Sequence, residues 1–409
     1  MVSNSQGIFL VFALTLLTWT VPVSAIEIQQ VISARGIKSW LVEDHANPII
    51  TVDFAFRGGA ALDPRGKEGL ANVVSSLLDE GAGTLDSKAF QTQLEDFSIS
   101  LRFNAERDNL SGSLRTLTRN YLRAFHLLKL ALTKPRFDRE AVERIRNQIL
   151  MGLKSDEEIP DRVASRVLFK TLFPNHPYGR PLRGTVETVP TISIEDMKML
   201  VGKRFARDNL VLSVVGDIKP LTLETAIDDV FGNLRDKAKP WDLEEVRPNP
   251  SGTAVVIEKR IPQSVIRFAH EGIKRDDPDF YSAYVMNYVL GGGGFASRLY
   301  QEVREKRGLA YSAFSYLLPF KAAALILGGA GSANVRVPET LKVLRDEWRR
   351  MSEFGLSEEE LENAKSYLTG SYPLRFTSTR KIASMLTGIQ LERLGIDYVH
   401  NRNGIINNV

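Results

Sequence analysis

Residues 49–56 read IITVDFAF, a strand-like run, and turn-rich residues 57–69 and a helical pattern over residues 70–80 follow it. Residues 264–269, SVIRFA, open the same order of elements again, with turn-rich residues 272–279 and a helical pattern over residues 280–290. A glycine follows each helical pattern, Gly81 in the first copy and Gly291 in the second. This repeat is stronger evidence for two related units than any single motif would be.

A second pair of segments extends the repeat: residues 137–152 (FDREAVERIRNQILMG) match residues 356–370 (LSEEELENAKSYLTG). Asp138 and Ser357 are the N-cap candidates, each followed by acidic residues in the first turn. Strands mixed with amphipathic helices predict the α+β class, with two homologous domains that each have a mostly antiparallel sheet and helices packed on one face. We expect the domains at residues 26–235 and 253–409, with a linker at residues 236–252.

The last elements of the first unit have no counterpart in the second. A helical pattern at residues 194–205 and a strand-like run at residues 209–215 (NLVLSVV) close the first unit. The spacing of 219 residues between positions 138 and 357 places the matching strand near position 428, beyond Val409. We therefore expect the second domain to be either truncated at its C-terminal end or degenerate.

The composition excludes several classes of protein and site. The 409 residues include 53 basic and 49 acidic side chains, and the resulting net charge of +4, with no run of five like charges, argues against a nucleic-acid partner. Charged residues at 25% and hydrophobic residues at 43% are ordinary for globular proteins. The absence of cysteine excludes disulfides, thiolate zinc sites and a cysteine nucleophile.

The first 25 residues resemble an export signal. They contain no charged residue, and an apolar run at residues 8–17 (IFLVFALTLL) precedes the small-residue pattern Val23-Ser24-Ala25. Because the run is too short to span a bilayer comfortably, we expect cleavage of residues 1–25, no stable membrane anchor, and a periplasmic or secreted protein. The missing basic residue near Met1 leaves a buried N-terminal helix as the alternative.

Four segments carry a family resemblance. They are residues 68–78 (EGLANVVSSLL), 173–184 (FPNHPYGRPLRG), 206–218 (ARDNLVLSVVGDI) and 297–316 (SRLYQEVREKRGLAYSAFSY), the last being the most specific. Together they resemble the pitrilysin/insulinase family of zinc metallopeptidases, in particular the two-domain type that includes the mitochondrial processing peptidase subunits. The resemblance implies a clamshell of two peptidase-like halves.

Active members of that family carry the zinc motif H-x-x-E-H on the helix after the GLA element, and a second helix some seventy-odd residues later supplies a Glu as third ligand. The matching positions here are Asn72, Ser75, Ser76 and, at or near the third ligand, Gly152. Neutral amide and hydroxyl oxygens are poor zinc ligands and cannot act as a base at neutral pH. The resemblance therefore implies a retained scaffold with a degenerate zinc site; without it, the three polar residues would simply be the solvated face of an amphipathic helix.

No other part of the sequence suggests a zinc site. No two histidines lie closer than 50 residues in the sequence, so no local ligand pair is formed by His45, His126, His176, His270 and His400. His176, in the turn-rich HPYGRP, is expected to be a hydrogen-bonded loop histidine. We expect no cofactor in this chain.

The second half retains what the resemblance identifies as the family's Arg/Tyr pair, Arg304 and Tyr311 in VREKRGLAY. In active members the phenol donates a hydrogen bond to the developing oxyanion, and the guanidinium binds substrate carbonyls or carboxylates. We expect Gly308 to end the helix and Tyr311 to lie on a strand. The alternative is a helix-terminal Arg beside a Tyr that packs on the sheet.

A run of four glycines precedes this segment, consisting of Gly291, Gly292, Gly293 and Gly294. Phe295-Ala296 follows, where a phosphate-binding P-loop would need Lys-Ser or Lys-Thr. The run therefore predicts either a turn that lets the substrate backbone approach or a plain helix stop.

These observations lead to one functional expectation with two alternatives. We expect a non-zinc-binding subunit of a heteromeric metallopeptidase, inactive alone, that supplies Arg304 and Tyr311 to a zinc-bearing paralogous partner acting on peptides or unfolded protein segments. The first alternative is a non-catalytic binding or assembly module with the peptidase fold. The second, an autonomous peptidase, needs a metal site that the sequence does not show.

Overall fold

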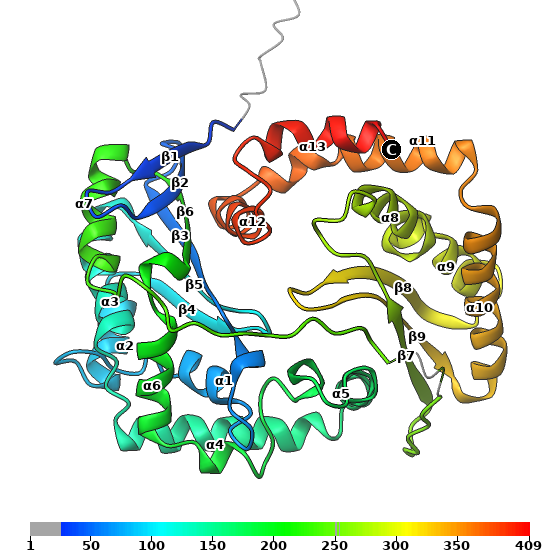
Figure 1. Cartoon of the computed structure of the whole chain (residues 1–409), viewed down its shortest axis with the longest axis horizontal. Helices are drawn as coiled ribbons and strands as arrows, with labels where there is room; N and C mark the ends of the chain where they lie inside the picture. Colours follow the sequence, from blue (N-terminus) through cyan, green and yellow to red (C-terminus); the bar gives the residue numbers. More distant parts are fainter. Residues whose placement is uncertain (1–25, 250–251, 253) are drawn as a thin grey trace, which may run out of the picture.

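The computed structural model describes residues 26–249, 252 and 254–409. Two α+β halves face each other, the first at the left of Figure 1 and the second at the right, and the chain crosses between them after α7 (Pro220–Phe231). The predicted α+β fold with two related halves is thus confirmed. The predicted export signal, residues 1–25, lies outside the described residues. Within the described part of the chain, no helix combines the length and apolar character needed to cross a membrane.

The first half is built on a six-stranded sheet with the order β1-β2-β6-β3-β5-β4. Only β2 and β6 pair in parallel, so the sheet is mostly antiparallel, as predicted. Alternate residues of β3, such as Val52 and Phe54, enter the core with the helices of this half. The strands are β1 Gln29–Ile32, β2 Lys38–Glu43, β3 Ile49–Arg57, β4 Ser100–Ala105, β5 Asn109–Leu117 and β6 Leu210–Gly216.

The second half contains a three-stranded antiparallel sheet with the order β7-β9-β8, which corresponds to β3-β5-β4 of the first. The strands are β7 Gln263–Glu271, β8 Ala310–Pro319 and β9 Ala324–Ala333. Among the described residues β7 pairs only with β9, whereas β3 pairs with both β5 and β6. The second sheet therefore has no described strand in the place of β6, the element for which the repeat gives no counterpart.

The helices follow the repeat closely. Helices α11 and α12 begin 219 residues after α4 and α5, at positions 358 and 379 against 139 and 160. In the first half the helices are α1 Leu70–Ser75, α2 Ser87–Asp96, α3 Tyr121–Thr133, α4 Arg139–Asp156, α5 Pro160–Leu172, α6 Ile194–Arg204 and α7. In the second they are α8 Phe280–Asn287, α9 Arg298–Tyr300, α10 Val337–Phe354, α11 Glu358–Gly370, α12 Thr379–Leu391 and α13 Tyr398–Asn407.

One helix of each half packs on the sheet of the other half. Helix α12 packs on β3 and β6 of the first sheet, where Gln390 Nε2 donates to the carbonyl of Leu212 at 3.0 Å. Helix α5 of the first half packs on β7, and its Asp161 forms an ion pair with Arg267 (Figure 1). The prediction of helices on one face is therefore incomplete, because the second face of each sheet is covered by a helix of the opposite half.

Candidate functional site

Helix α1 carries Asn72 and Ser75 of the degenerate zinc motif, Ser76 is its C-cap, and a buried carboxylate fixes where the helix starts. Asp63 accepts hydrogen bonds from the backbone N–H groups of Gly69 (2.9 Å) and Ala71 (3.1 Å). Burial raises the pKa of Asp63 to about 7, while these N–H groups act in the opposite direction. Gly69, the N-cap of α1, has φ +96°, a conformation that favours glycine. This conformation lets the chain begin the helix beside the Asp63 carboxylate.

The polar positions of α1 bond to their own helix. The hydroxyls of Ser75 and Ser76 both donate to the carbonyl of Asn72, at 2.9 and 2.8 Å. The helix ends at Ser75 and not near residue 80 as its pattern predicts. Ser75 is only 5% exposed, so the alternative of a solvated polar face does not hold for this residue. These two hydroxyl protons already have partners within the helix.

The fourth position of the motif, Gly152, lies inside α4 and faces an arginine. A Cβ atom added at Gly152 would lie 2.8 Å from Nη2 of Arg183. Nη1 of the same guanidinium donates to Asp156 at 2.6 Å. A cationic group thus stands where the family resemblance places a carboxylate ligand, and the residues present do not fit zinc.

No alternative metal site appears in the described residues, where no three His, Cys, Asp or Glu side chains gather around one point. The ring nitrogens of His45 contact carboxylates of Asp217 (2.6 Å) and Glu43 (3.3 Å), and these hydrogen bonds raise the pKa of His45. Nδ1 of His176 accepts from the backbone N–H of Tyr178 at 3.2 Å, which confirms the prediction of a hydrogen-bonded loop histidine.

The Arg/Tyr pair is assembled in the second half. The guanidinium carbon of Arg304 lies 4.7 Å from the ring centre of Tyr311 and 4.9 Å from that of Tyr300. Gly308, at φ +59°, ends the helical segment, and Tyr311 lies on β8 as predicted. The Tyr311 side chain is 74% exposed, so it is not packed on the sheet as the alternative required. The pair therefore offers a phenol and a guanidinium on one open surface.

The glycine run has mainly a packing role. Helix α8 ends at Asn287, and a π-helical turn continues from Tyr288 to Gly292, so Gly291 does not stop the helix as predicted. Gly291 is buried, and a Cβ there would lie 2.3 Å from Oγ of Ser315 on β8. Within the run, only Gly294 has open space around its Cβ position, and substrate approach at the four glycines stays a prediction.

The two sets of predicted site residues lie in different halves. In Figure 1, α1 is at the lower left, whereas α9 and β8 are at the right. No hydrogen bond or ion pair among the described residues joins Asn72, Ser75, Ser76 or Gly152 to Arg304 or Tyr311. The structure thus keeps the Arg/Tyr pair apart from the degenerate motif of the same chain.

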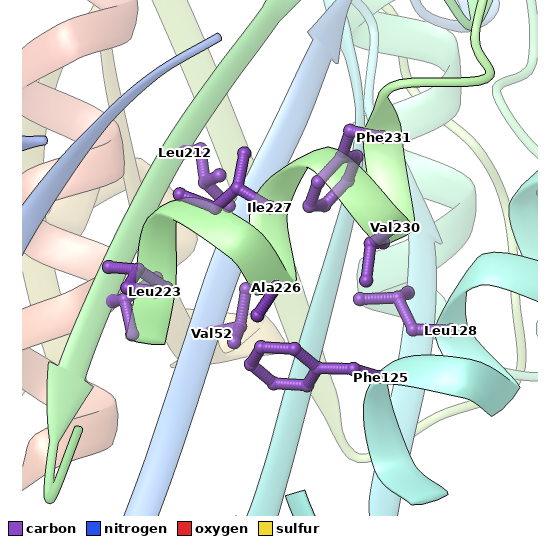
Figure 2. Close-up of a pocket in the computed structure, with 10 residues that line it drawn as sticks. Val52, Phe125, Leu128, Leu212, Leu223, Ala226, Ile227, Val230 and Phe231 are labelled. Carbon is purple, nitrogen blue, oxygen red and sulfur yellow. The ribbon is translucent and has the colours of Figure 1, made fainter. Parts of the chain in front are cut away.

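The sequence did not predict a polar cavity of about 440 Å³ that lies between α12 and strands β3, β4 and β5. Burial raises the pKa of Asp53 to about 6 and also raises that of Glu106, which line it together with Arg102 and Asn104. A lone carboxylate inside the apolar run IITVDFAF was the available signal. A second cavity, of about 10 Å³, has only apolar walls and is a packing gap under α7 (Figure 2).

Comparison with known proteins identifies the family. Residues 39–186 match the insulinase domain of peptidase family M16, and residues 191–368 match the peptidase M16 inactive domain. The chain belongs to peptidase family M16. This confirms the family predicted from the four sequence segments. With Asn72, Ser75, Ser76 and Gly152 at the ligand positions, this M16 chain is a non-catalytic member that keeps the peptidase fold without its zinc ligands.

Three relatives illustrate the likeness. The Helicobacter pylori protein named non-peptidase homolog YmxG is 30% identical over 334 residues, 81% of this M16 chain and 77% of that protein. The mitochondrial-processing peptidase subunit beta of Saccharomyces cerevisiae is 23% identical over 350 residues, 81% and 75% of the two chains. A crystal structure from Pseudomonas fluorescens, described as a peptidase M16 inactive domain, superposes with a TM-score of 0.87 at 28% identity, covering 94% of this chain and 92% of that chain.

Proposed function

We propose that this protein is the zinc-less subunit of a heteromeric, extracytoplasmic M16 peptidase, in which it supplies Arg304 and Tyr311 to the site of a zinc-bearing paralogous subunit. The observation that carries the proposal is the Arg304–Tyr311 pair, with its exposed phenol, in a chain whose own zinc positions are lost. The substrates would be peptides or unfolded protein segments that add as an extended strand to a sheet edge.

The chemistry of the pair suits a shared site. The exposed phenol of Tyr311 can donate a hydrogen bond to a substrate carbonyl as this becomes an oxyanion. The two flanking rings, of Tyr300 and Tyr311, hold the guanidinium of Arg304 by cation–π contacts, which limits its side-chain freedom before substrate arrives. Neither group can replace a metal-bound water, so the proposal requires zinc in the partner.

Two further observations support the assembly and its compartment. One relative is named as a subunit of the mitochondrial processing peptidase, which makes a paired assembly a reasonable model for this chain. The apolar residues 8–17 followed by Val23-Ser24-Ala25 support export, with cleavage after residue 25.

The test is the Tyr311→Phe variant in the complex with the zinc-bearing partner, identified as a co-purifying M16 protein that carries H-x-x-E-H. We expect kcat to fall by about 10²–10³, because one oxyanion donor is lost, while KM changes little because the ring remains. Tyr316→Phe is the matched control, since Tyr316 lies on the same strand and is 42% exposed; it should leave kcat unchanged.

The second candidate is a non-catalytic binding or assembly module. The names of two relatives, a non-peptidase homolog and an inactive domain, favour it. An unchanged kcat in the Tyr311→Phe complex, with the partner's zinc ligands still essential, would contradict the shared site and support this second function.

A further inference from the structure

The guanidinium of Arg183 occupies the space into which a residue 152 side chain would extend. At 2.8 Å from the Cβ position of Gly152, Nη2 lies well inside ordinary van der Waals contact. The hydrogen bond to Asp156, one helical turn further along α4, holds this guanidinium in place. The backbone of Arg183 also passes close to Gly69, the N-cap of α1, since its carbonyl oxygen would lie 2.7 Å from a Cβ atom added there. Arg183 thus joins the two helices that carry the degenerate motif.

We propose that the guanidinium of Arg183, held by Asp156, takes the place of the metal ion in this half. Zinc binding is then prevented by Arg183 as well as by the four degenerate motif positions. This inference concerns only the chain's own motif and does not depend on the proposed partner.

The reason is competition for the third ligand. A carboxylate introduced at position 152 would meet a guanidinium already within contact distance and would pair with it, because Arg binds carboxylates in a charge-assisted, bidentate manner. If the guanidinium instead moved away, Asp156 would lose its partner and face the new carboxylate one turn away on the same helix face. A fixed positive charge would also repel a zinc ion at this point.

The direct test rebuilds the motif with and without the arginine. The four-site variant combines Asn72→His, Ser75→Glu, Ser76→His and Gly152→Glu, and the five-site variant adds Arg183→Leu. Zinc affinity is measured by competition with a chromogenic chelator. We expect the five-site variant to bind one zinc about 10- to 100-fold more tightly than the four-site variant. The four-site variant with Arg183→Lys, which keeps the charge, should bind as weakly as the four-site variant itself.

Equal zinc affinities of the four- and five-site variants would overturn the proposal, and so would failure of both to bind zinc while their circular dichroism remains native. A second measurement covers the case in which the multiple variants do not fold. Gly152→Glu should raise Tm above that of Gly152→Gln by about 1 to 3 °C when Arg183 is present. This advantage should disappear in the Arg183→Leu background; an advantage that persists there would show that the guanidinium does not capture the carboxylate.

Discussion

Asp53 lies on β3 between Val52 and Phe54, and its side chain faces the polar cavity beneath α12. Burial raises its pKa from an ordinary value near 3.8 to about 6, so the folded protein holds this proton more tightly than the unfolded chain does. Its contribution to stability is therefore complete below about pH 4 and is lost as the pH rises through 6.

Between pH 4 and pH 7.5, the free energy of unfolding should fall less in the Asp53→Asn variant than in the wild type, because a neutral amide has no proton to release. The difference between the two falls should be up to about 3 kcal/mol. Urea unfolding at the two pH values measures this. Ser113→Ala is the control. Ser113 lies on β5 opposite Asp53 of β3 and lines the same cavity, but it does not titrate. Equal pH dependence in wild type and Asp53→Asn would show that this carboxyl ionises normally.

Single residues were predictable where a motif fixes their spacing. Asn72, Ser75 and Ser76 follow from the helix after the GLA element, and the Arg304–Tyr311 pair follows from its seven-residue separation. Arg183 was not predictable, because its approach to Gly152 depends on how a turn-rich segment folds back over α4. Neither periodicity nor a local motif records such a contact between residues 31 positions apart.

At the scale of elements, the two matching helices α4 and α11 start with different N-caps. Ser357 forms a capping box with Glu360: its hydroxyl accepts from the Glu360 N–H at 3.2 Å, and the Glu360 carboxylate accepts from the Ser357 N–H at 2.9 Å. Hydrogen bonding from Arg298 lowers the pKa of Glu360 to about 2, so the carboxylate stays charged. Asp138 occupies the N-cap of α4, but its carboxylate contacts Arg136 at 2.6 Å and makes no capping bond.

We therefore expect Ser357→Ala to lower the free energy of unfolding by about 1 kcal/mol. Asp138→Ala, the matched change at the related helix, should cost measurably less, because it removes an exposed ion pair and no capping hydrogen bond. Chemical denaturation of both variants measures the difference. A loss at Asp138 as large as that at Ser357 would contradict the assignment of the caps.

Periodicity located most elements but not all of their ends. The apolar stripe of α1 is buried as its spacing predicts, yet the helix stops early, where Ser75 and Ser76 bond back to the carbonyl of Asn72. In the sequence Gly291 resembles a helix stop. In the structure it lies in a π-helical turn, and its lack of a side chain lets this turn pack closely on β8. In both cases a local hydrogen bond or a tertiary contact, which hydrophobic spacing does not encode, decides the boundary.

On the scale of the whole molecule, α12 of the second half packs on the first sheet and α5 of the first half packs on the second sheet, so each half depends on the other. The sequence predicted the repeat but not this packing of α5 and α12 on the opposite sheets. A repeat shows which elements are equivalent, but it does not show which sheet each helix covers. The face of the first sheet under α12 is apolar at β2 and β6, where Trp40, Val42 and Val215 are buried. Leu386 of α12 belongs to the same buried cluster and has no exposed surface.

Leu386→Ala should therefore destabilise the first half although Leu386 belongs to the second. Removing a fully buried leucine side chain typically costs about 2–5 kcal/mol, and the cavity would open against the first sheet. Hydrogen exchange should then accelerate in β2 and β6 as well as in α12. Leu374→Ala is the control, since Leu374 precedes α12 and is 69% exposed; it should change neither stability nor exchange measurably. If exchange in Leu386→Ala accelerates only within residues 254–409, the halves fold independently, and the packing of α12 on the first sheet contributes little to the stability of that sheet.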